Sequence, residues 1–283
     1  MKKITSSILL TLIALFLVSS VQAQLISASD FMDLRKSDKN MVVVDCNKED
    51  VYGKAHIMNA VNVPHTSLYK EGEVEGLIKS PEELAKIFGE NGVNNENTIV
   101  LYDDGSNKYT SRVYWVLDYL GADNVMILHK DMDLWKKSRV PLTRSKTNVK
   151  PTTFTPKVNE SIIVSTDFVK NNISDPNVLV FDSRDLEEYN GTSEKSDGHI
   201  KGALHLNYKD LLDENGAFKS KDELESIASK HGITKDKTTV FYCLTSVRAA
   251  AGYVAFAEIL GYPNIKVYDG AYNEWVARGL PIE

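Results

Sequence analysis

The second half of this chain repeats the first, and this internal repeat constrains the fold more than any other feature. From Thr98 onward, matching residues lie 140 positions apart: Tyr102 and Tyr242, Gly121 and Gly261, Asn124 and Asn264, Trp135 and Trp275, and Pro141 and Pro281. Self-similarity over about 100 residues indicates a duplicated domain, because solenoid repeats have periods of roughly 20–50 residues. We therefore expect two copies of one domain.

Each copy alternates short apolar runs with amphipathic helical runs. Strands are expected at Met41–Asp45, Thr98–Tyr102 and Val125–Leu128, and again at Val178–Asp182 and Thr238–Tyr242. Helices are expected from Pro81 and over residues 109–120 and 249–260. This alternation is typical of an α/β domain with a parallel sheet covered by helices on both faces. We place domain 1 at 24–143, a linker rich in Thr, Lys and Pro at 144–158, and domain 2 at 159–283.

Residues 1–23 have the layout of a secretory signal peptide. Lys2 and Lys3 form a basic start, an apolar run spans residues 8–18, and Val21-Gln22-Ala23 is a small-residue cleavage site. The apolar run is too short for a spanning helix, which needs roughly 20 residues. We expect a cleaved leader, a mature chain that begins at Gln24, and export to the periplasm of a bacterium or secretion.

The composition excludes several kinds of partner. A formal net charge of −6 argues against nucleic acid or an anionic membrane surface. Two cysteines cannot form a disulfide framework. The six histidines show no metal-ligand spacing with cysteine or carboxylate. We expect no metal, no cofactor, small-molecule substrates and a monomer.

Cys243 lies where an expected strand ends and an expected helix begins. Unpaired loop amides and the positive end of a helix dipole favour a thiolate at such a position. Arg248 adds a fixed positive charge at the far side of the loop. We therefore interpret Cys243 as the nucleophile. The alternative is a small buried side chain, which is what free cysteines most often are.

The repeat allows an internal comparison at this position. Domain 1 has Asp103 where domain 2 has Cys243. A carboxylate has no thiol chemistry and repels an anion. We therefore expect domain 1 to be catalytically inactive and to wall the cleft.

At this point the chain resembles the tandem-domain rhodanese family of sulfurtransferases over nearly all of its mature length. The resemblance rests on Asp182-Ser183-Arg184, the G-H-I-K-G-A run from Gly198 to Ala203, Tyr242-Cys243, Tyr268-Asp269-Gly270, Trp275 and Gly279-Leu280-Pro281. It implies two domains, each with a five-stranded parallel sheet, an inert first domain and a cysteine in the second. That cysteine takes a sulfane sulfur as a persulfide and passes it to cyanide or a thiol.

The loop C-L-T-S-V-R differs from the patterns C-R-K-G-V-T of thiosulfate-preferring members and C-G-S-G-V-T of mercaptopyruvate-preferring members. It has no base directly after the cysteine, and Ser246 stands where glycine is usual. An exported enzyme is expected to meet thiosulfate more readily than 3-mercaptopyruvate, which is a cytosolic amino-acid catabolite. We therefore place thiosulfate ahead of 3-mercaptopyruvate as the donor.

Several further residues are candidates for substrate binding. Arg184 follows a strand end, where its guanidinium could hold sulfonate or carboxylate oxygens; the alternative is a surface ion pair with Glu187 or Glu188. Arg248 could bind substrate or cap the loop carbonyls. The hydroxyls of Thr245 and Ser246 could bind substrate or satisfy loop backbone. Leu244 and Val247 complete the loop.

Several other residues are expected to have structural roles. His56 and His199 occupy matching positions in both halves, which indicates an architectural role, although His56 could reach the cleft. Trp135 and Trp275 are expected in the core. Cys46 is expected to be a buried free thiol, with oxidation against Cys243 as the alternative.

Two other functions stay open beside the sulfurtransferase. A phosphatase or arsenate reductase has a similar cysteine loop, but its C-x5-R spacing is one residue wider than the C-x4-R from Cys243 to Arg248. A periplasmic persulfide carrier without fast turnover would have the same sequence features.

Overall fold

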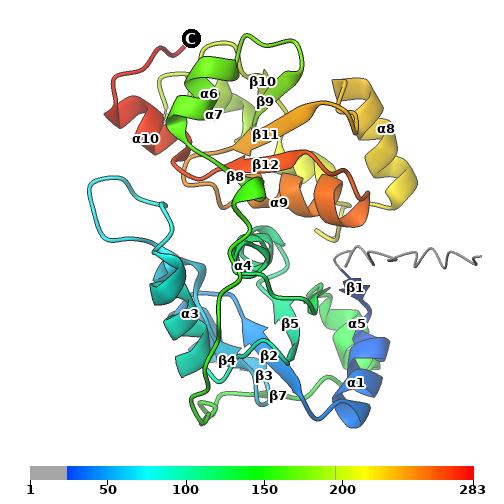
Figure 1. Ribbon diagram of the computed structural model, residues 1–283. Coiled ribbons are helices and arrows are strands. Elements are labelled where there is room, and N and C mark those ends of the chain that lie inside the picture. The colour runs from blue at the N-terminus through cyan, green and yellow to red at the C-terminus, as the bar shows by residue number, and fades with distance from the viewer. Residues whose placement is uncertain (1–23, 195) are drawn as a thin grey trace, which may run out of the picture.

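Two α/β domains follow one another along the chain in the computed structural model, which describes residues 24–194 and 196–283 (Figure 1). The expected signal peptide lies outside the described residues. No helix in the described part is long and apolar enough to cross a membrane. Each domain has one five-stranded parallel sheet.

The sheet of domain 1 has the strand order β1-β6-β5-β2-β4, and every neighbouring pair is parallel. The elements in chain order are β1 (Gln24–Ile26), α1 (Ala28–Ser37), β2 (Met41–Asp45), α2 (Glu49–Lys54), β3 (His56–Ile57), β4 (Val61–Asn62), η1 (His65–Leu68), α3 (Pro81–Glu90), β5 (Thr98–Tyr102), α4 (Lys108–Tyr119), β6 (Val125–Leu128), α5 (Met132–Lys137) and β7 (Leu142–Thr143).

The sheet of domain 2 has the order β10-β9-β11-β12-β8, which is the same topology strand for strand. Its elements are η2 (Glu160–Ile162), β8 (Ile163–Val164), α6 (Thr166–Asn172), β9 (Val178–Asp182), α7 (Leu186–Tyr189), β10 (Leu204–His205), η3 (Tyr208–Leu211), α8 (Lys221–His231), β11 (Thr238–Tyr242), α9 (Ala249–Tyr253), η4 (Val254–Ile259), β12 (Ile265–Tyr268) and α10 (Ala271–Ala277). The expected α/β fold with duplicated sheets is confirmed.

Local chemistry explains where the helices begin. Ser80 caps α3 in a capping box with Glu83, and Pro81 occupies the first helical position. Helix α1 begins at Ala28, because the hydroxyl of Ser27 caps it by accepting the N–H of Asp30. The expected helix over 249–260 is a short α-helix that continues as the π-helix η4.

The two halves share a buried tyrosine bridge. The hydroxyl of Tyr102 accepts the N–H of Ile57 at 3.0 Å, and the hydroxyl of Tyr242 accepts that of Ile200 at 3.1 Å. Each bridge ties the central strand to the segment that carries the repeated His-Ile pair. Removing either hydroxyl would leave a buried N–H without an acceptor.

The repeated histidines have the architectural role that the sequence predicted. His56 contacts the carbonyls of Tyr52 and Ser145, and its ring stacks on Tyr52. His199 contacts the carbonyl of Tyr189 and stacks on that ring. Both rings therefore fasten backbone segments and do not face the cleft.

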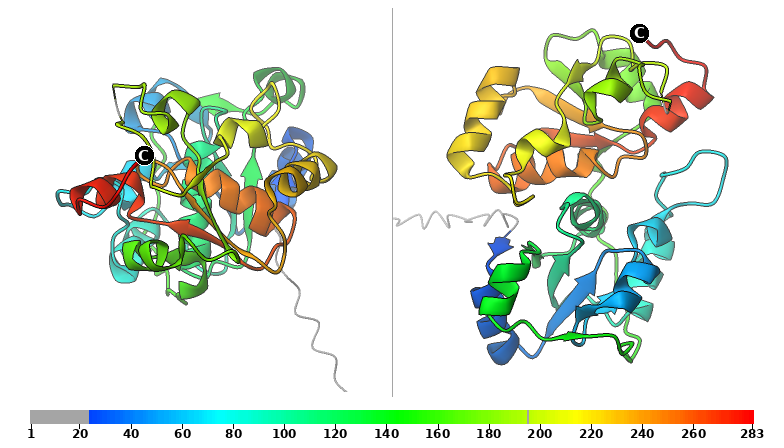
Figure 2. Two further views of the ribbon diagram at one scale, coloured as in Figure 1. Left: turned by 90° about the horizontal axis from the view of Figure 1, so that it is seen from above. Right: turned by 180° about the vertical axis from the view of Figure 1, so that it is seen from behind.

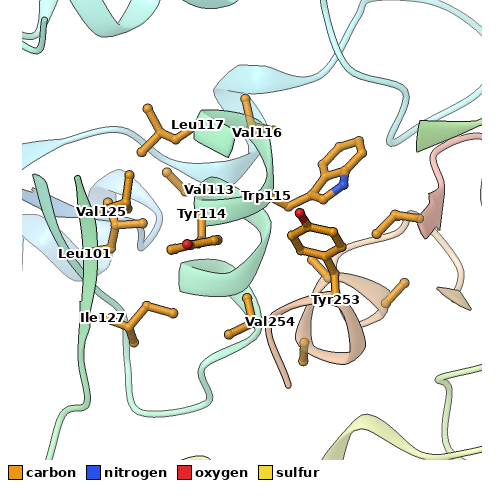
Figure 3. Packing of buried hydrophobic residues seen from close by; sticks show 14 of the residues in the cluster. Leu101, Val113, Tyr114, Trp115, Val116, Leu117, Val125, Ile127, Tyr253 and Val254 are labelled. Atoms are coloured by element: carbon orange, nitrogen blue, oxygen red, sulfur yellow. The ribbon is translucent and has the colours of Figure 1, made fainter. Parts of the chain in front are cut away.

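The domains meet along α4, which lies between the two sheets and packs on α9 (Figures 1 and 2). Tyr253 and Val254 of domain 2 contact the helix that carries Tyr114 and Trp115 (Figure 3). The hydroxyl of Tyr114 donates to Glu258 at 2.7 Å across the boundary. One apolar cluster thus runs through both domains. This shared core holds the walls of the interdomain site together.

Candidate active site

Cys243 follows β11, the central strand of its sheet, and is 1% exposed. The start of α10 anchors the loop that follows it. The N–H of Tyr272 donates to the Cys243 carbonyl at 2.9 Å, and that of Asn273 donates to the Leu244 carbonyl at 3.3 Å. The carbonyls on this side of the loop are therefore occupied by protein donors.

The N–H groups of the loop are differently placed. In the part of the chain that the structure describes, the backbone N–H groups of Thr245, Ser246 and Val247 donate to no protein acceptor. Free amides beside a buried sulfur are the donors that a negatively charged sulfur requires.

Asp103 shows how the equivalent loop of domain 1 accommodates an anion. Its two carboxylate oxygens accept four backbone N–H groups, at 2.8, 3.2, 3.1 and 3.2 Å, from Gly105, Asn107, Tyr109 and Thr110. Domain 1 therefore fills its loop with its own side chain.

Arg248 lies beside Cys243, and a carboxylate holds its guanidinium in place. Glu188 accepts two hydrogen bonds from its guanidinium, at 2.5 and 2.9 Å. Burial lowers the pKa of Arg248, but hydrogen bonds with Glu188 and the Cys243 sulfur outweigh this and raise it. The Arg248 guanidinium therefore places a permanent positive charge beside the Cys243 sulfur.

The prediction that the Arg184 guanidinium could hold substrate oxygens is wrong. Its side chain is 0% exposed. Asp182 takes hydrogen bonds from Nε and Nη2, Ser196 and the Gly198 carbonyl take the remaining contacts, and the guanidinium lies 4.0 Å over the ring of Tyr272. The alternative of a surface ion pair is also wrong, because Arg184 forms a buried ion pair with Asp182.

Ser246 also has a structural role. It adopts a φ of 61°, in the left-handed region where glycine is usual. Its hydroxyl donates to the carbonyl of Tyr268 and lies 3.3 Å from that of Asp269. The expected substrate contact is therefore wrong, and the alternative role in satisfying backbone is confirmed.

A cavity of about 450 Å³ opens at the Cys243 loop between the domains. Domain 2 contributes Leu244, Thr245, Val247 and Arg248. The facing wall comes from domain 1 and includes Lys48, His65, Tyr69, Lys108 and Tyr109. A larger cavity of about 660 Å³ lies between domain 1 and the linker, away from Cys243, and the chemistry of the loop favours the smaller one.

Two aromatic residues of domain 1 are close to the reactive loop. Burial raises the pKa of Tyr69 to about 12; Arg112 opposes this, and Cys243 and Thr245 act on the same hydroxyl. Burial also lowers the pKa of His65 to about 4, so its imidazole is neutral at pH 7. Domain 1 therefore supplies polar groups to the site.

A second contact between the domains closes the site. Arg112 donates to Asp269 at 2.7 Å and to the Gly76 carbonyl at 2.7 Å. The backbone of Gly76 is so close to Thr245 that a Cβ there would lie 2.6 Å from the threonine Cβ. The segment around Gly76 therefore covers the Cys243 loop.

Other predicted residues lie as expected. Trp135 and Trp275 are buried in matching cores, and Cys46 is a buried free thiol. Among the described residues, no three His, Cys, Asp or Glu side chains converge as metal ligands would.

Four residues of the site were not predicted from the sequence: Glu188, which is the partner of Arg248, and His65, Tyr69 and Lys108. Glu188 had appeared only as a possible partner of Arg184. No sequence pattern marks the three domain 1 residues as part of the site, because their proximity to the Cys243 loop depends on how the two domains pack.

The family model described as "Rhodanese-like domain" matches the chain twice, over residues 27–138 and 165–278. The thiosulfate sulfurtransferase of Azotobacter vinelandii is 27% identical over 247 residues, which cover 86% of this chain and 91% of the relative. The sulfur carrier protein TtuD of Thermus thermophilus is 28% identical over 275 residues, 92% of this chain and 96% of the relative.

Solved structures have the same fold. The 3-mercaptopyruvate sulfotransferase SseA of Escherichia coli superposes with a TM-score of 0.79 at 27% identity, covering 88% of this chain and 99% of that one. EanB in complex with ergothioneine reaches a TM-score of 0.81 at 21% identity, covering 92% and 70%, and supports the fold alone.

Proposed function

Because this chain belongs to the rhodanese family of the thiosulfate/3-mercaptopyruvate sulfurtransferase type, we propose that it moves a sulfane sulfur from thiosulfate to cyanide or a thiol through a persulfide on Cys243. The observation that carries this proposal is the loop itself. A buried cysteine lies among free amides and beside Arg248, at the position where domain 1 holds the carboxylate of Asp103.

In the first half-reaction the Cys243 thiolate attacks the outer sulfur of thiosulfate. A new S–S bond forms at Sγ, the S–S bond of thiosulfate breaks, and sulfite leaves with the electron pair. The loop amides and Arg248 stabilise the negative charge that spreads over the sulfur and the departing group.

In the second half-reaction the acceptor attacks the outer sulfur of the persulfide. Cyanide becomes thiocyanate, or a thiolate becomes an organic persulfide, and Sγ regains its electron pair. The cycle has no net demand for an oxidant or a cofactor. Electrostatic stabilisation by prearranged donors is the protein's contribution to both steps.

Intact-mass measurement tests the proposal. After incubation with thiosulfate the protein should gain the mass of one sulfur atom and lose it on addition of cyanide. Cys243→Ser should do neither, while Cys46→Ala should do both, because burial raises the pKa of the Cys46 thiol well above its usual range. A sulfur adduct on Cys46 in the Cys243→Ser protein would contradict the assignment.

Two alternatives have specific support. The similarity to SseA favours 3-mercaptopyruvate as a second candidate donor, with the same nucleophile. The similarity to TtuD favours a persulfide carrier that turns over slowly with small acceptors. Steady-state rates with both donors and with cyanide separate these functions.

We further propose that the protein is exported to the periplasm, on the basis of the leader pattern in residues 1–23. Fractionation followed by intact-mass measurement tests this. A mature chain that begins at Gln24 in the periplasmic fraction is the expected result, and a full-length cytoplasmic chain would contradict it.

A further inference from the structure

The end of β2 in domain 1 lacks a cation that the matching strand end of domain 2 has. In domain 2, β9 ends at Asp182, and the guanidinium of Arg184 donates to both oxygens of that carboxylate. In domain 1, β2 ends at Asp45, and Asn47 stands where the repeat has Arg184. All four residues are buried, with exposures of 0 to 2%. Domain 1 therefore keeps the buried carboxylate but not its charged partner.

Asn47 satisfies only one of the two carboxylate oxygens of Asp45. Its backbone N–H and its side-chain Nδ2 both donate to Oδ1 of Asp45, at 2.9 and 2.7 Å, so the amide and the carboxylate lie side by side. In the described part of the chain, Oδ2 of Asp45 and Oδ1 of Asn47 have no hydrogen-bond partner. Two neighbouring oxygen acceptors are thus buried without a donor. Such atoms cost free energy unless a ligand satisfies them.

The charge of Asp45 is incompletely balanced. The corresponding carboxylate of domain 2 forms an ion pair with Arg184 at 2.6 Å, whereas Asp45 forms none with any described residue. Burial raises the pKa of the Asp45 carboxyl. The nearby hydroxyl of Tyr102, the amides of Asn47 and the charge of Lys130 oppose this shift only in part. Domain 2 has the same tyrosine beside its carboxylate and still uses a guanidinium, so a hydroxyl does not replace the positive charge.

The atoms at this position determine which kind of cation fits. Both acceptors are hard oxygens, one from a carboxylate and one from an amide, and such oxygens suit alkali and alkaline-earth ions better than soft transition metals. Only one carboxylate is present, and among the described residues no three His, Cys, Asp or Glu side chains converge. A single positive charge therefore balances the site, as the guanidinium does in domain 2.

We propose that Oδ2 of Asp45 and Oδ1 of Asn47 bind a monovalent metal cation, Na⁺ or K⁺, in the place that corresponds to the Arg184 guanidinium. This inference is independent of the proposed function, because it concerns the fold of domain 1. The ion stabilises the segment that follows β2. The Cys46 carbonyl of that segment accepts the N–H of His65 at 3.4 Å, so the same segment supports one wall of the interdomain cavity.

The test measures folding stability in different salts. Urea titrations of the protein are carried out in KCl, in NaCl and in choline chloride, at one chloride concentration and one pH. Choline has the same charge but is too large to reach two buried oxygens. Because only the folded protein has the site, a bound cation multiplies the folding equilibrium constant by 1 + [cation]/Kd, or about elevenfold at ten times Kd. The wild type should be more stable in at least one alkali chloride than in choline chloride, and the difference should grow with concentration.

Three variants locate the effect. Asn47→Arg supplies the guanidinium that domain 2 has, and Asp45→Asn removes the carboxylate, so each should be equally stable in all three salts. Asp45→Asn is isosteric and decides the question alone where Asn47→Arg does not fold. Asp33→Asn removes an exposed carboxylate of α1 and is the control that should keep the wild-type difference.

Equal stability of the wild type in all three salts would overturn the site, because the buried oxygens would then be satisfied without a cation. A difference between salts that persists in Asp45→Asn would overturn the assignment to these residues. Loss of the difference in Asp33→Asn as well would indicate a general salt effect and would overturn the proposal equally.

Discussion

Glu188 holds Arg248 by two hydrogen bonds, of 2.5 and 2.9 Å, so that the guanidinium stays beside the Cys243 sulfur. The pair joins the first turn after β9 to the end of the catalytic loop. It is mostly buried, with side-chain exposures of 17% and 9%. A partly buried bidentate pair both orients the cation and stabilises the fold.

Glu188→Gln should therefore lower the free energy of unfolding at pH 7 by about 1.5–3 kcal/mol, the range for hydrogen bonds to charged groups. Burial raises the pKa of Glu188, but the hydrogen bonds and charge of Arg248 outweigh this and lower it below the usual 4.5. The stabilisation is thus complete above the unfolded-state pKa and disappears as the pH falls through the lower folded-state pKa.

Urea titrations of wild type and variant between pH 7 and pH 3 measure this difference. The exposed neighbour Glu187→Gln is the control and should have little effect at any pH. A stability difference that grows as the pH falls would contradict the prediction.

Arg184→Lys should damage the fold and leave substrate recognition intact. Lysine keeps the charge but cannot reproduce the fork to Asp182 or all the contacts with Ser196 and the Gly198 carbonyl, so we expect a loss of about 1.5–3 kcal/mol in the free energy of unfolding. The KM for thiosulfate of the folded protein should not change. Arg278→Lys, in an exposed pair with Asp167, is the control and should have little effect on stability. A raised KM with normal stability would restore Arg184 to the substrate site.

Gly76→Ala should separate the covering segment from the catalytic loop. The new Cβ would meet Thr245, and the φ of 106° is strained for any residue with a Cβ. We expect kcat/KM to fall at least tenfold, because small displacements of positioned groups have effects of that order. Gly232→Ala has a φ of 68° and open space, so it tests the strain without the clash. Equal activity in the two variants would show that the contact is dispensable.

Within the described part, the order of strands and helices in each domain could be predicted from the sequence, because it depends on local patterns of apolar and polar residues. The run Val178–Asp182 is continuous and apolar, as a buried parallel strand must be, and it pairs with β11 in register. Cys243 was predicted to be the nucleophile from its place at a strand end and by comparison with its own repeat. Both inferences use only neighbouring residues or a fixed offset.

The remaining features of the site depend on packing between distant segments. Arg184 was misplaced because a strand end brings a residue to the correct edge of the sheet but does not set the direction of its side chain. Asp182 and Ser196 turn it inward. His65 and Tyr69 reach the Cys243 loop only because α4 packs on α9, a contact that no single-segment pattern encodes.

We propose thiosulfate as the preferred donor on the basis of the groups that surround the Cys243 sulfur. With Arg184 buried elsewhere, Arg248 and the loop amides carry the task of binding a dianion. Arg248→Lys keeps the charge but loses the fork to Glu188, so kcat/KM for thiosulfate should fall by about tenfold to 150-fold, the equivalent of about 1.5–3 kcal/mol.

Thr245→Val removes a hydroxyl that lies beside Tyr69 and should affect the activity with 3-mercaptopyruvate more than that with thiosulfate, because the departing enolate needs a proton donor. Steady-state kinetics with both donors on the three proteins measure this. If the wild type uses 3-mercaptopyruvate more efficiently and Thr245→Val abolishes that activity, then the order of donors is the reverse of the one argued from Arg248.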